Sequence, residues 1–192
     1  MKNIMIVSDG IPGHFNQSNG VALLLSNKHS LNTRIIDLQF KSQFLRGFIT
    51  VFSRFMMRLP SPLTAKLTLL LYKKIDTRGL DLIIAAGGKT APYTAALRIL
   101  NKIPVIQLGS PRGLHSSLFN ALVTVERYHE DSSNIIASIT PSLYSPEVCK
   151  QAAKEKGLSE HLLFLIGGEG IGYSYKENEW KDLINAIKLM YK

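Results

Sequence analysis

Short apolar runs alternate with amphipathic stretches along most of the chain. Strands are expected where aliphatic and β-branched residues follow one another, over residues 2–8, 33–38, 81–86, 103–108, 121–125, 134–139 and 162–166. Helical patterns separate them, over residues 16–30, 90–101, 146–156 and 177–191, and over a longer region of about 40–75 that Pro60 and Pro62 interrupt. Apolar strands with helices between them are typical of a parallel sheet. The pattern therefore predicts an α/β fold, a Rossmann-like, mostly parallel sheet with helices on both faces.

The region 40–75 combines an aromatic stripe with a block of positive charge. At about 100° per residue, five Phe side chains fall within an arc of about 120°, at positions 40, 44, 48, 52 and 55. Residues 41–75 carry several Lys and Arg and contain no Asp or Glu. An amphipathic, basic helix suits two environments, the protein core or an anionic membrane surface. The pattern by itself leaves both open.

Charge is distributed unevenly along the chain, whose net charge is +9. Residues 1–112 hold 15 Lys and Arg against 4 Asp and Glu, whereas residues 113–192 hold 8 against 10. A block of one sign implies an anionic partner such as nucleic acid, a phosphorylated ligand or anionic lipid. We expect no nucleic-acid partner, because the sequence has no helix-turn-helix, RNA-recognition or zinc-knuckle signature.

Composition narrows the class of protein further. The 192 residues are 45% hydrophobic and 19% charged, which is enough apolar material for a real core. The single cysteine, Cys149, excludes a disulfide framework, and the histidines show no ligand spacing, so we expect no metal site. No run approaches the ~18 apolar residues of a membrane span, and the apolar run at residues 4–7 is too short for a signal peptide. The expected location is the cytoplasm, with peripheral attachment to the inner face of the membrane through residues 41–75 left open.

The loop after the first predicted strand is rich in polar side chains. Ligands of Rossmann-like folds bind beyond the carboxyl ends of the strands, so this loop is a candidate site. His14 is a candidate general base that Asp9 would orient, and Gly13, Asn16 and Gln17 would line the site. The same residues also suit a structural turn, in which Asp9 and Asn16 cap backbone amides and His14 packs the loop.

Three later turns carry weaker signals for an anionic ligand. Gly88, Lys89 and Thr90 follow a predicted strand and suit a phosphate, although a Gly-Gly turn with Thr90 as helix cap is an equally good interpretation. Arg112 follows the next strand and is a candidate phosphate clamp. Gly167 and Gly168 form another glycine-rich turn, which is either a second phosphate-binding turn or a hinge.

Residues 9–20 match the pattern D-G-x-P-G-H-x-N-Q-x-x-G, and the order of the later turns agrees with it over essentially the whole chain. On these residues the sequence resembles the mitochondrial-fission Elm-like family, which looks like a GT-B glycosyltransferase. Where that family usually has a Pro-x-His-like stretch, this chain has Val125 to His129. The family also continues well beyond the equivalent of Lys192.

The resemblance implies a glycosyltransferase-like protein with two Rossmann-like halves and a site between them. Residues 1–160 would form the N-terminal, acceptor-side domain, and residues 161–192 would begin a truncated second domain or pack back on the first. A nucleotide-sugar would be co-substrate, with no cofactor, and a glycan or lipid-linked acceptor would be the other substrate. A second chain would complete the cleft if the chain is one half of an assembly. The alternatives are a non-catalytic peripheral membrane adaptor and a small nucleotide-binding module.

Overall fold

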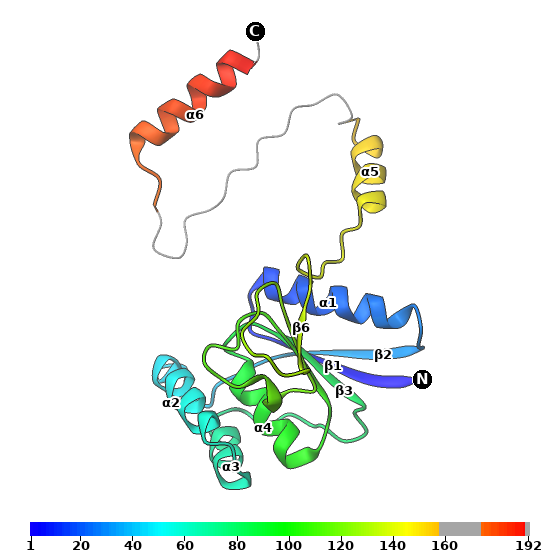
Figure 1. The fold of residues 1–192 in the computed structure, drawn as a ribbon, viewed down its shortest axis with the longest axis vertical. Coiled ribbons are helices and arrows are strands. Elements are labelled where there is room, and N and C mark those ends of the chain that lie inside the picture. Colours follow the sequence, from blue (N-terminus) through cyan, green and yellow to red (C-terminus); the bar gives the residue numbers. More distant parts are fainter. Residues whose placement is uncertain (158–173, 191–192) are drawn as a thin grey trace. The chain divides into compact units, whose positions relative to one another are not determined.

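In a computed structural model, which describes residues 1–157 and 174–190, the chain divides into two units, Met1–Cys149 and Lys150–Lys192. The first unit contains a sheet of six strands in the order β2-β1-β3-β4-β5-β6, and every neighbouring pair is parallel. The predicted Rossmann-like fold class is thereby confirmed (Figure 1). The strands are β1 (Lys2–Ser8), β2 (Leu31–Asp37), β3 (Leu82–Ala86), β4 (Val105–Leu108), β5 (Ala121–Thr124) and β6 (Asn134–Ile136).

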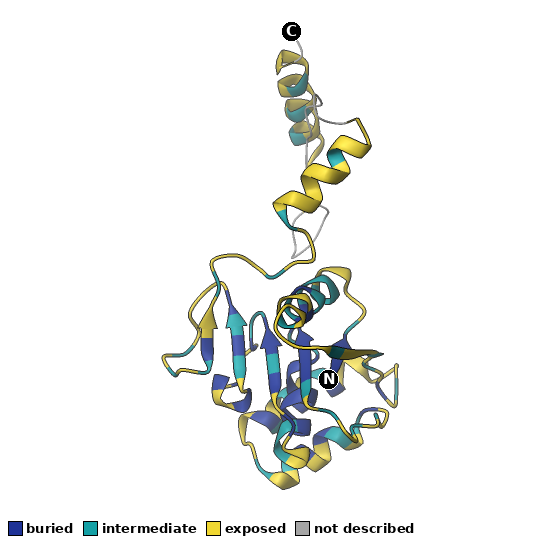
Figure 2. Cartoon of the chain, turned by 90° about the vertical axis from the view of Figure 1, so that its right-hand side faces the viewer, coloured by how far each residue is buried: buried dark blue, intermediate teal, exposed yellow. Residues whose placement is uncertain are grey.

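Helix α1 (Pro12–Ser26) covers one face of this sheet, and α2 (Arg46–Arg58), α3 (Pro62–Leu70) and α4 (Ala91–Asn101) cover the other (Figure 1). The later helices are α5 (Pro146–Glu155) and α6 (Glu177–Met190), and a short 3₁₀ helix spans Ser116–Leu118. Successive strand residues point to opposite faces, so Ile4 and Ile6 pack toward α1 while Met5 and Val7 pack toward the other helices. Figure 2 shows that the central strands are largely buried.

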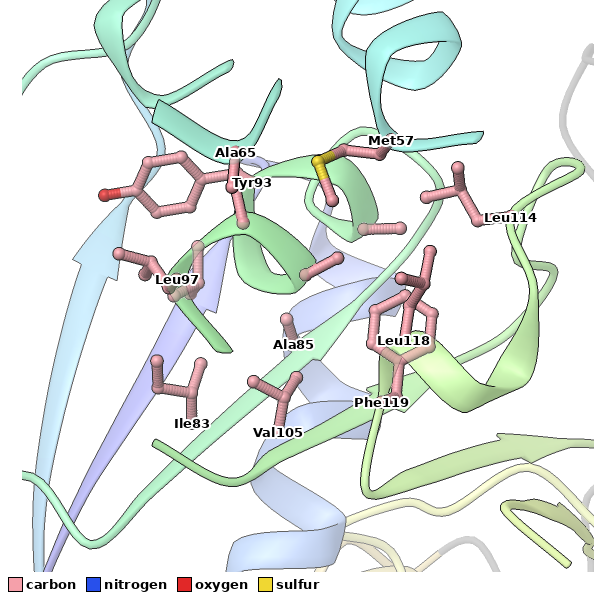
Figure 3. Close-up of a cluster of buried hydrophobic side chains, with 14 of the residues drawn as sticks. Met57, Ala65, Ile83, Ala85, Tyr93, Leu97, Val105, Leu114, Leu118 and Phe119 are labelled. Carbon is pink, nitrogen blue, oxygen red and sulfur yellow. The ribbon is translucent and has the colours of Figure 1, made fainter. Parts of the chain in front are cut away.

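The larger core cluster lies on the face that α2, α3 and α4 cover. Ile83 and Ala85 of β3 and Val105 of β4 belong to the same buried cluster as Tyr93 and Leu97 of α4 (Figure 3). Met57 of α2 and Ala65 of α3 are fully buried members of the same cluster, with further members in Leu114, Leu118 and Phe119. This packing fixes α2 close to the strand ends, which matters for the site below.

Strand order creates a topological switch point between β1 and β3. Strand β2 pairs with one edge of β1 and β3 pairs with the other, so that Ile6 lies opposite Ile35 and Ile84. The chain leaves β1 into α1 on one face of the sheet and leaves β3 into α4 on the other. A crevice opens beyond the carboxyl ends of the strands at such a point, and it is the usual ligand site of open α/β sheets.

Several predicted boundaries differ from the observed ones. Helix α1 begins at Pro12 instead of residue 16, because proline at the first helical position has its φ preset and needs no hydrogen-bond partner. The region 40–75 is two helices, and its first residues are extended, with Phe40 pairing with Tyr72 in an antiparallel bridge. The predicted strand over residues 162–166 and the Gly167–Gly168 turn lie outside the described residues.

The aromatic stripe of α2 faces outward. The buried residues of this helix are Ile49, Ser53 and Met57, which recur at every fourth position, close to the helical repeat of about 3.6 residues, and so lie on one side. The opposite side holds Phe48, Val51, Phe55 and Leu59, which are 64%, 65%, 55% and 66% exposed. Packing in the core is therefore the wrong interpretation for most of this stripe, and only Phe40, at 5% exposure, joins the core. None of the described helices is both long enough and apolar enough to traverse a bilayer.

Candidate functional site

An Asp–His pair stands at the carboxyl end of β1. His14 Nδ1 lies 2.9 and 3.1 Å from the two carboxylate oxygens of Asp9, whose side chain is 2% exposed. Asp9 Oδ1 also accepts a hydrogen bond of 3.2 Å from the backbone N–H of Ile11. A carboxylate partner on Nδ1 favours the tautomer with its proton there, so Nε2 carries the free lone pair. The His14 side chain is 31% exposed, and in this tautomer Nε2 is the ring atom that would accept a proton.

The turn after β3 packs directly against this pair. Gly87 has φ +86°, and a Cβ atom at this position would overlap the His14 imidazole. A Cβ atom at the neighbouring Gly88 would overlap Arg112 Cγ instead. Two consecutive glycines therefore seat a histidine that follows β1 and an arginine that follows β4. His14 and Arg112 therefore both lie against the Gly87–Gly88 turn, at the carboxyl ends of the strands.

Two further arginines from α2 join Arg112. A Cβ atom at Gly113 would lie 2.7 Å from Arg58 Nη2, which places the Arg58 guanidinium on the loop after β4. Burial lowers the pKa of Arg54, and the positive charges of Arg112 and Arg58 lower it further, against the opposing effect of Tyr72. Arg54 Nε is buried and has no hydrogen-bond partner in the part of the chain that the structure describes. We call Arg54, Arg58 and Arg112 the arginine cluster.

The arginine cluster lacks local countercharge. No ion pair to any of its three guanidinium groups occurs among the described residues. Like charges held this close raise the free energy of the protein, and an anion bound between them would offset that cost. The cluster is accordingly suited to a phosphate group. The sequence does not distinguish Arg54 and Arg58 from the other basic residues of 41–75, because it does not show which face of α2 meets the strand ends.

Thr90 lies beneath the site and not in it. It is fully buried, and its hydroxyl donates to the backbone carbonyls of Ala86 and Gly87, at 3.0 and 2.8 Å. The buried Gln107 amide supports the same turn, donating to the Gly87 carbonyl at 3.0 Å. Of the two interpretations of this turn that the sequence leaves open, the geometry supports a structural role for Thr90. Thr90 and Gln107 fix the glycine turn.

The remaining predicted residues lie around two cavities. Lys89 lines a cavity of about 140 Å³ together with Asp9, Asp37 and Arg46. Gln17 lines another of about 220 Å³, next to Gly109 and Thr124 at the ends of β4 and β5. Both therefore open at the same edge of the sheet as the Asp9–His14 pair.

Asn16 and Gly13, in the first turns of α1, differ in their surroundings. Asn16 Nδ2 donates to Ser142 Oγ at 3.1 Å, so its amide is used within the protein to hold the segment after β6. A Cβ atom at Gly13 would meet nothing within 4 Å, which leaves this end of α1 open. No side chain caps the start of the helix. Among the described residues no group of three His, Cys, Asp or Glu is placed to hold a metal ion.

Comparison with known proteins gives one result. A family model described as "Mitochondrial fission ELM1" matches residues 12–192 of the chain. No curated protein and no solved structure matches the chain. The matched range begins at the first residue of α1 and therefore includes His14, the glycine turn and the whole arginine cluster.

Proposed function

Because the chain belongs to the mitochondrial fission ELM1 family, we propose that it is the acceptor-side domain of a GT-B-like glycosyltransferase. Its donor would be a nucleotide-sugar and its acceptor an envelope or lipid-linked glycan at a membrane surface. One observation carries the proposal: a carboxylate-oriented histidine and Arg112 meet at the Gly87–Gly88 turn of a Rossmann-like sheet, and the arginine cluster to which Arg112 belongs has no ion-pair partner among the described residues. Glycosyl transfer from a nucleotide-sugar requires a base to deprotonate the acceptor hydroxyl and cationic groups to bind the diphosphate that leaves.

Each group has a defined role in this reaction. His14 Nε2 removes the proton of the acceptor hydroxyl while that oxygen attacks the anomeric carbon of the sugar. Asp9 holds the imidazole in place and stabilises the imidazolium that forms. The bond between the anomeric carbon and the diphosphate breaks, and the negative charge that develops on the leaving phosphate is offset by the arginine cluster. The glycine turn keeps the two centres at a fixed separation.

The outer faces of α2 and α3 support the membrane-surface part of the proposal. Leu63, Leu67 and Leu70 of α3 are 67%, 41% and 53% exposed, which adds to the outward aromatic face of α2. Lys and Arg residues accompany them, with no acidic residue in 41–75. A surface that combines apolar side chains with unopposed positive charge is complementary to an anionic bilayer, where each basic residue adds about 1 kcal/mol.

The proposal is tested by supplying the purified chain with a panel of nucleotide-sugars and with polyprenyl-phosphate or oligosaccharide acceptors, with and without the C-terminal half of a longer homologue. Release of nucleotide diphosphate that depends on the acceptor is the expected result. His14→Gln should lower the rate by about 10² or more, the usual contribution of a positioned base. Arg112→Gln should weaken donor binding while the fold, checked by thermal unfolding, is kept.

Arg98→Gln is the matched control for Arg112→Gln, because Arg98 is a partly exposed arginine that donates hydrogen bonds to Asn120 and Ser117 outside the site. It should leave nucleotide release unchanged. The transferase proposal would be refuted if no nucleotide-sugar is turned over and none raises the melting temperature, either with or without the C-terminal half of the longer homologue.

A non-catalytic membrane adaptor is the second candidate, and the exposed apolar faces of α2 and α3 favour it. An adaptor needs that surface but not the Asp9–His14 pair. Asp9→Asn and His14→Gln would then leave the cellular function of the protein intact, whereas serine substitutions at Phe48 and Phe55 would abolish it. The opposite pattern supports the transferase.

A further inference from the structure

A cavity of about 340 Å³ lies in the helical layer, bounded by α3, α4 and the segment of residues 72–77. None of its lining residues belongs to the candidate site described above. Its volume falls in the range of small-molecule sites, about 300–1,000 Å³. The residues that line it divide into an apolar floor and a basic rim.

The floor consists of side chains that also form the core. Tyr72, Tyr93 and Leu97 are 1%, 2% and 4% exposed, and Leu69 and Leu100 extend the apolar wall toward the surface. Such a wall accepts hydrocarbon and gives little to a small hydrophilic anion, whose hydration would be lost there. The Tyr93 hydroxyl is directed away from the centre of the buried cluster (Figure 3).

The rim carries four lysines, Lys41, Lys66, Lys73 and Lys74. Backbone pairing explains why residues so far apart in sequence meet: Lys41 N–H donates to the Leu71 carbonyl at 3.0 Å and Lys73 N–H donates to the Gln39 carbonyl at 2.8 Å. None of the four ammonium groups forms an ion pair within residues 1–157 and 174–190. The nearby carboxylate of Asp76 is paired with Arg78 at 2.8 Å.

Tyr93, in the floor of the cavity, adds a neutral hydrogen-bond donor to it. No hydrogen bond from its hydroxyl to another described residue is formed, whereas the Tyr72 hydroxyl donates to Ser53 Oγ at 3.2 Å. Burial raises the pKa of Tyr93 to about 12, with the neighbouring Tyr72 contributing, so the phenol keeps its proton at neutral pH. It can therefore donate to an anion that the lysines attract.

We propose that this cavity binds an anionic amphiphile, with its phosphate or carboxylate among the four lysines and the first carbons of its chain on the apolar floor. The lysines alone would bind any phosphate, and the apolar wall alone would bind any hydrocarbon. Together they select a ligand that has both an anionic head group and a hydrocarbon chain. Leu70 lines the cavity and also belongs to the outward face of α3. The cavity therefore opens onto the surface that would meet a bilayer, and a membrane lipid is the expected source of the ligand.

Dodecyl phosphate below its critical micelle concentration is the probe, and isothermal titration calorimetry of the full chain is the measurement. Saturable binding is expected for dodecyl phosphate but not for inorganic phosphate or for dodecyl maltoside, which lack the chain and the charge respectively. The double variant Lys73→Gln/Lys74→Gln should weaken binding at least about tenfold, equivalent to about 1.4 kcal/mol. Lys150→Gln/Lys154→Gln removes the same charge from α5, outside the cavity, and should have no effect.

Two further variants keep the test independent of the lysines. Leu100→Trp places a larger side chain at the half-exposed wall and should abolish binding by filling the cavity, and Tyr93→Phe should weaken it severalfold by removing one donor. Far-UV circular dichroism and thermal unfolding check that each variant folds. The proposal is overturned if dodecyl phosphate does not saturate, or if it binds Leu100→Trp and the Lys73/Lys74 variant as tightly as it binds the wild type.

Vesicles distinguish a membrane lipid from a free amphiphile as the source. The chain is floated with phosphatidylcholine vesicles that contain or lack phosphatidylglycerol. If Leu100→Trp lowers recovery with the acidic vesicles, the ligand is a bilayer lipid. If recovery is unchanged while dodecyl phosphate binding is lost, the ligand is a free amphiphile. Either outcome for Leu100→Trp supports the cavity as the binding site. The proposed transferase reaction plays no part in these measurements, so the two proposals fail independently.

Discussion

Two adjacent glycines decide where the His14 and Arg112 side chains lie. At Gly87 the left-handed backbone excludes most other residues, and the missing Cβ leaves room for the imidazole. Arg112 itself has φ +52°, an uncommon conformation for an arginine, and its loop continues into Gly113 at φ +83°. Backbone strain of this kind is tolerated where the surrounding structure fixes it, and here it lies next to the proposed reaction centre.

Gly87→Ala should both strain the backbone and displace His14. The left-handed conformation alone costs about 1–2 kcal/mol for a residue with a Cβ, and the overlap with the ring adds to it. Urea unfolding measures the stability, and the rate of nucleotide release measures the effect on the histidine. We expect a loss of stability together with a rate close to that of His14→Gln.

Gly79→Ala is the matched control for this substitution. Gly79 has φ +69°, but a Cβ atom there would meet nothing within 4 Å. It should therefore show the backbone strain without any effect on the rate. Equal effects of the two substitutions on the rate would contradict the role of Gly87 as the seat of His14.

Helix α2 has three functional sides, and this is the main feature at the scale of elements. One side packs into the core through Ile49 and Met57, and the opposite side exposes Phe48 and Phe55. The flank between them carries Arg54 and Arg58, the two members of the arginine cluster that belong to this helix. A single helix thus connects the outward apolar surface to the strand ends. A protein that works on a lipid-linked substrate needs these two surfaces close together.

Removing the outward aromatic side chains should weaken membrane binding without unfolding the chain. Phe48→Ser/Phe55→Ser deletes two rings that are more than half exposed, so little core packing is lost. Recovery of the variant with acidic vesicles in a flotation assay should fall severalfold, and that of the wild type should fall when salt is raised, since exposed charges are screened.

Leu24→Ser is the control, because Leu24 is 62% exposed on α1, a helix on the other face of the sheet. It should float as well as the wild type. Equal recovery of the wild type with neutral and acidic vesicles would remove the electrostatic contribution of residues 41–75 to membrane binding.

At the scale of the whole molecule, the core that the structure describes belongs to the first unit. The six described strands lie within Met1–Cys149, as do both clusters of buried hydrophobic residues found among residues 1–157 and 174–190. Neither α5 nor α6 contributes a buried residue among those described. The stability of the sheet should therefore be independent of the segment that follows it.

A fragment of residues 1–145 should fold by itself. It ends before α5 and retains every strand pair, so we expect cooperative thermal unfolding with a midpoint within about 4 °C of that of the full chain, which corresponds to about 1 kcal/mol for a domain of this size. Differential scanning calorimetry of both proteins is the measurement. A fragment that unfolds without cooperativity would show that residues after 145 are part of the folding unit.

Much of this fold could be predicted from the sequence, because helices, strands and turns are specified by residues that are close together in the chain. The periodicity of apolar residues identified the described strands and the parallel sheet, and the Asp9–His14 pair was predictable because only five positions separate the two residues. Contacts between residues that are distant in sequence could not be predicted in this way. Arg58 and Arg112 meet through packing of α2 against the strand ends, and nothing in either neighbourhood indicates the other.

The sequence by itself determined the order of strands and helices, the glycine turns and the excess of positive charge, since hydrogen bonding and side-chain placement within a few residues control them. Only the tertiary structure decided which side of each element is buried. It turned the aromatic side of α2 outward, placed Thr90 beneath the turn and assembled the lysine-rimmed cavity. The physical reason is that burial depends on contacts between segments far apart in the chain, and one helical or strand pattern is compatible with more than one such arrangement.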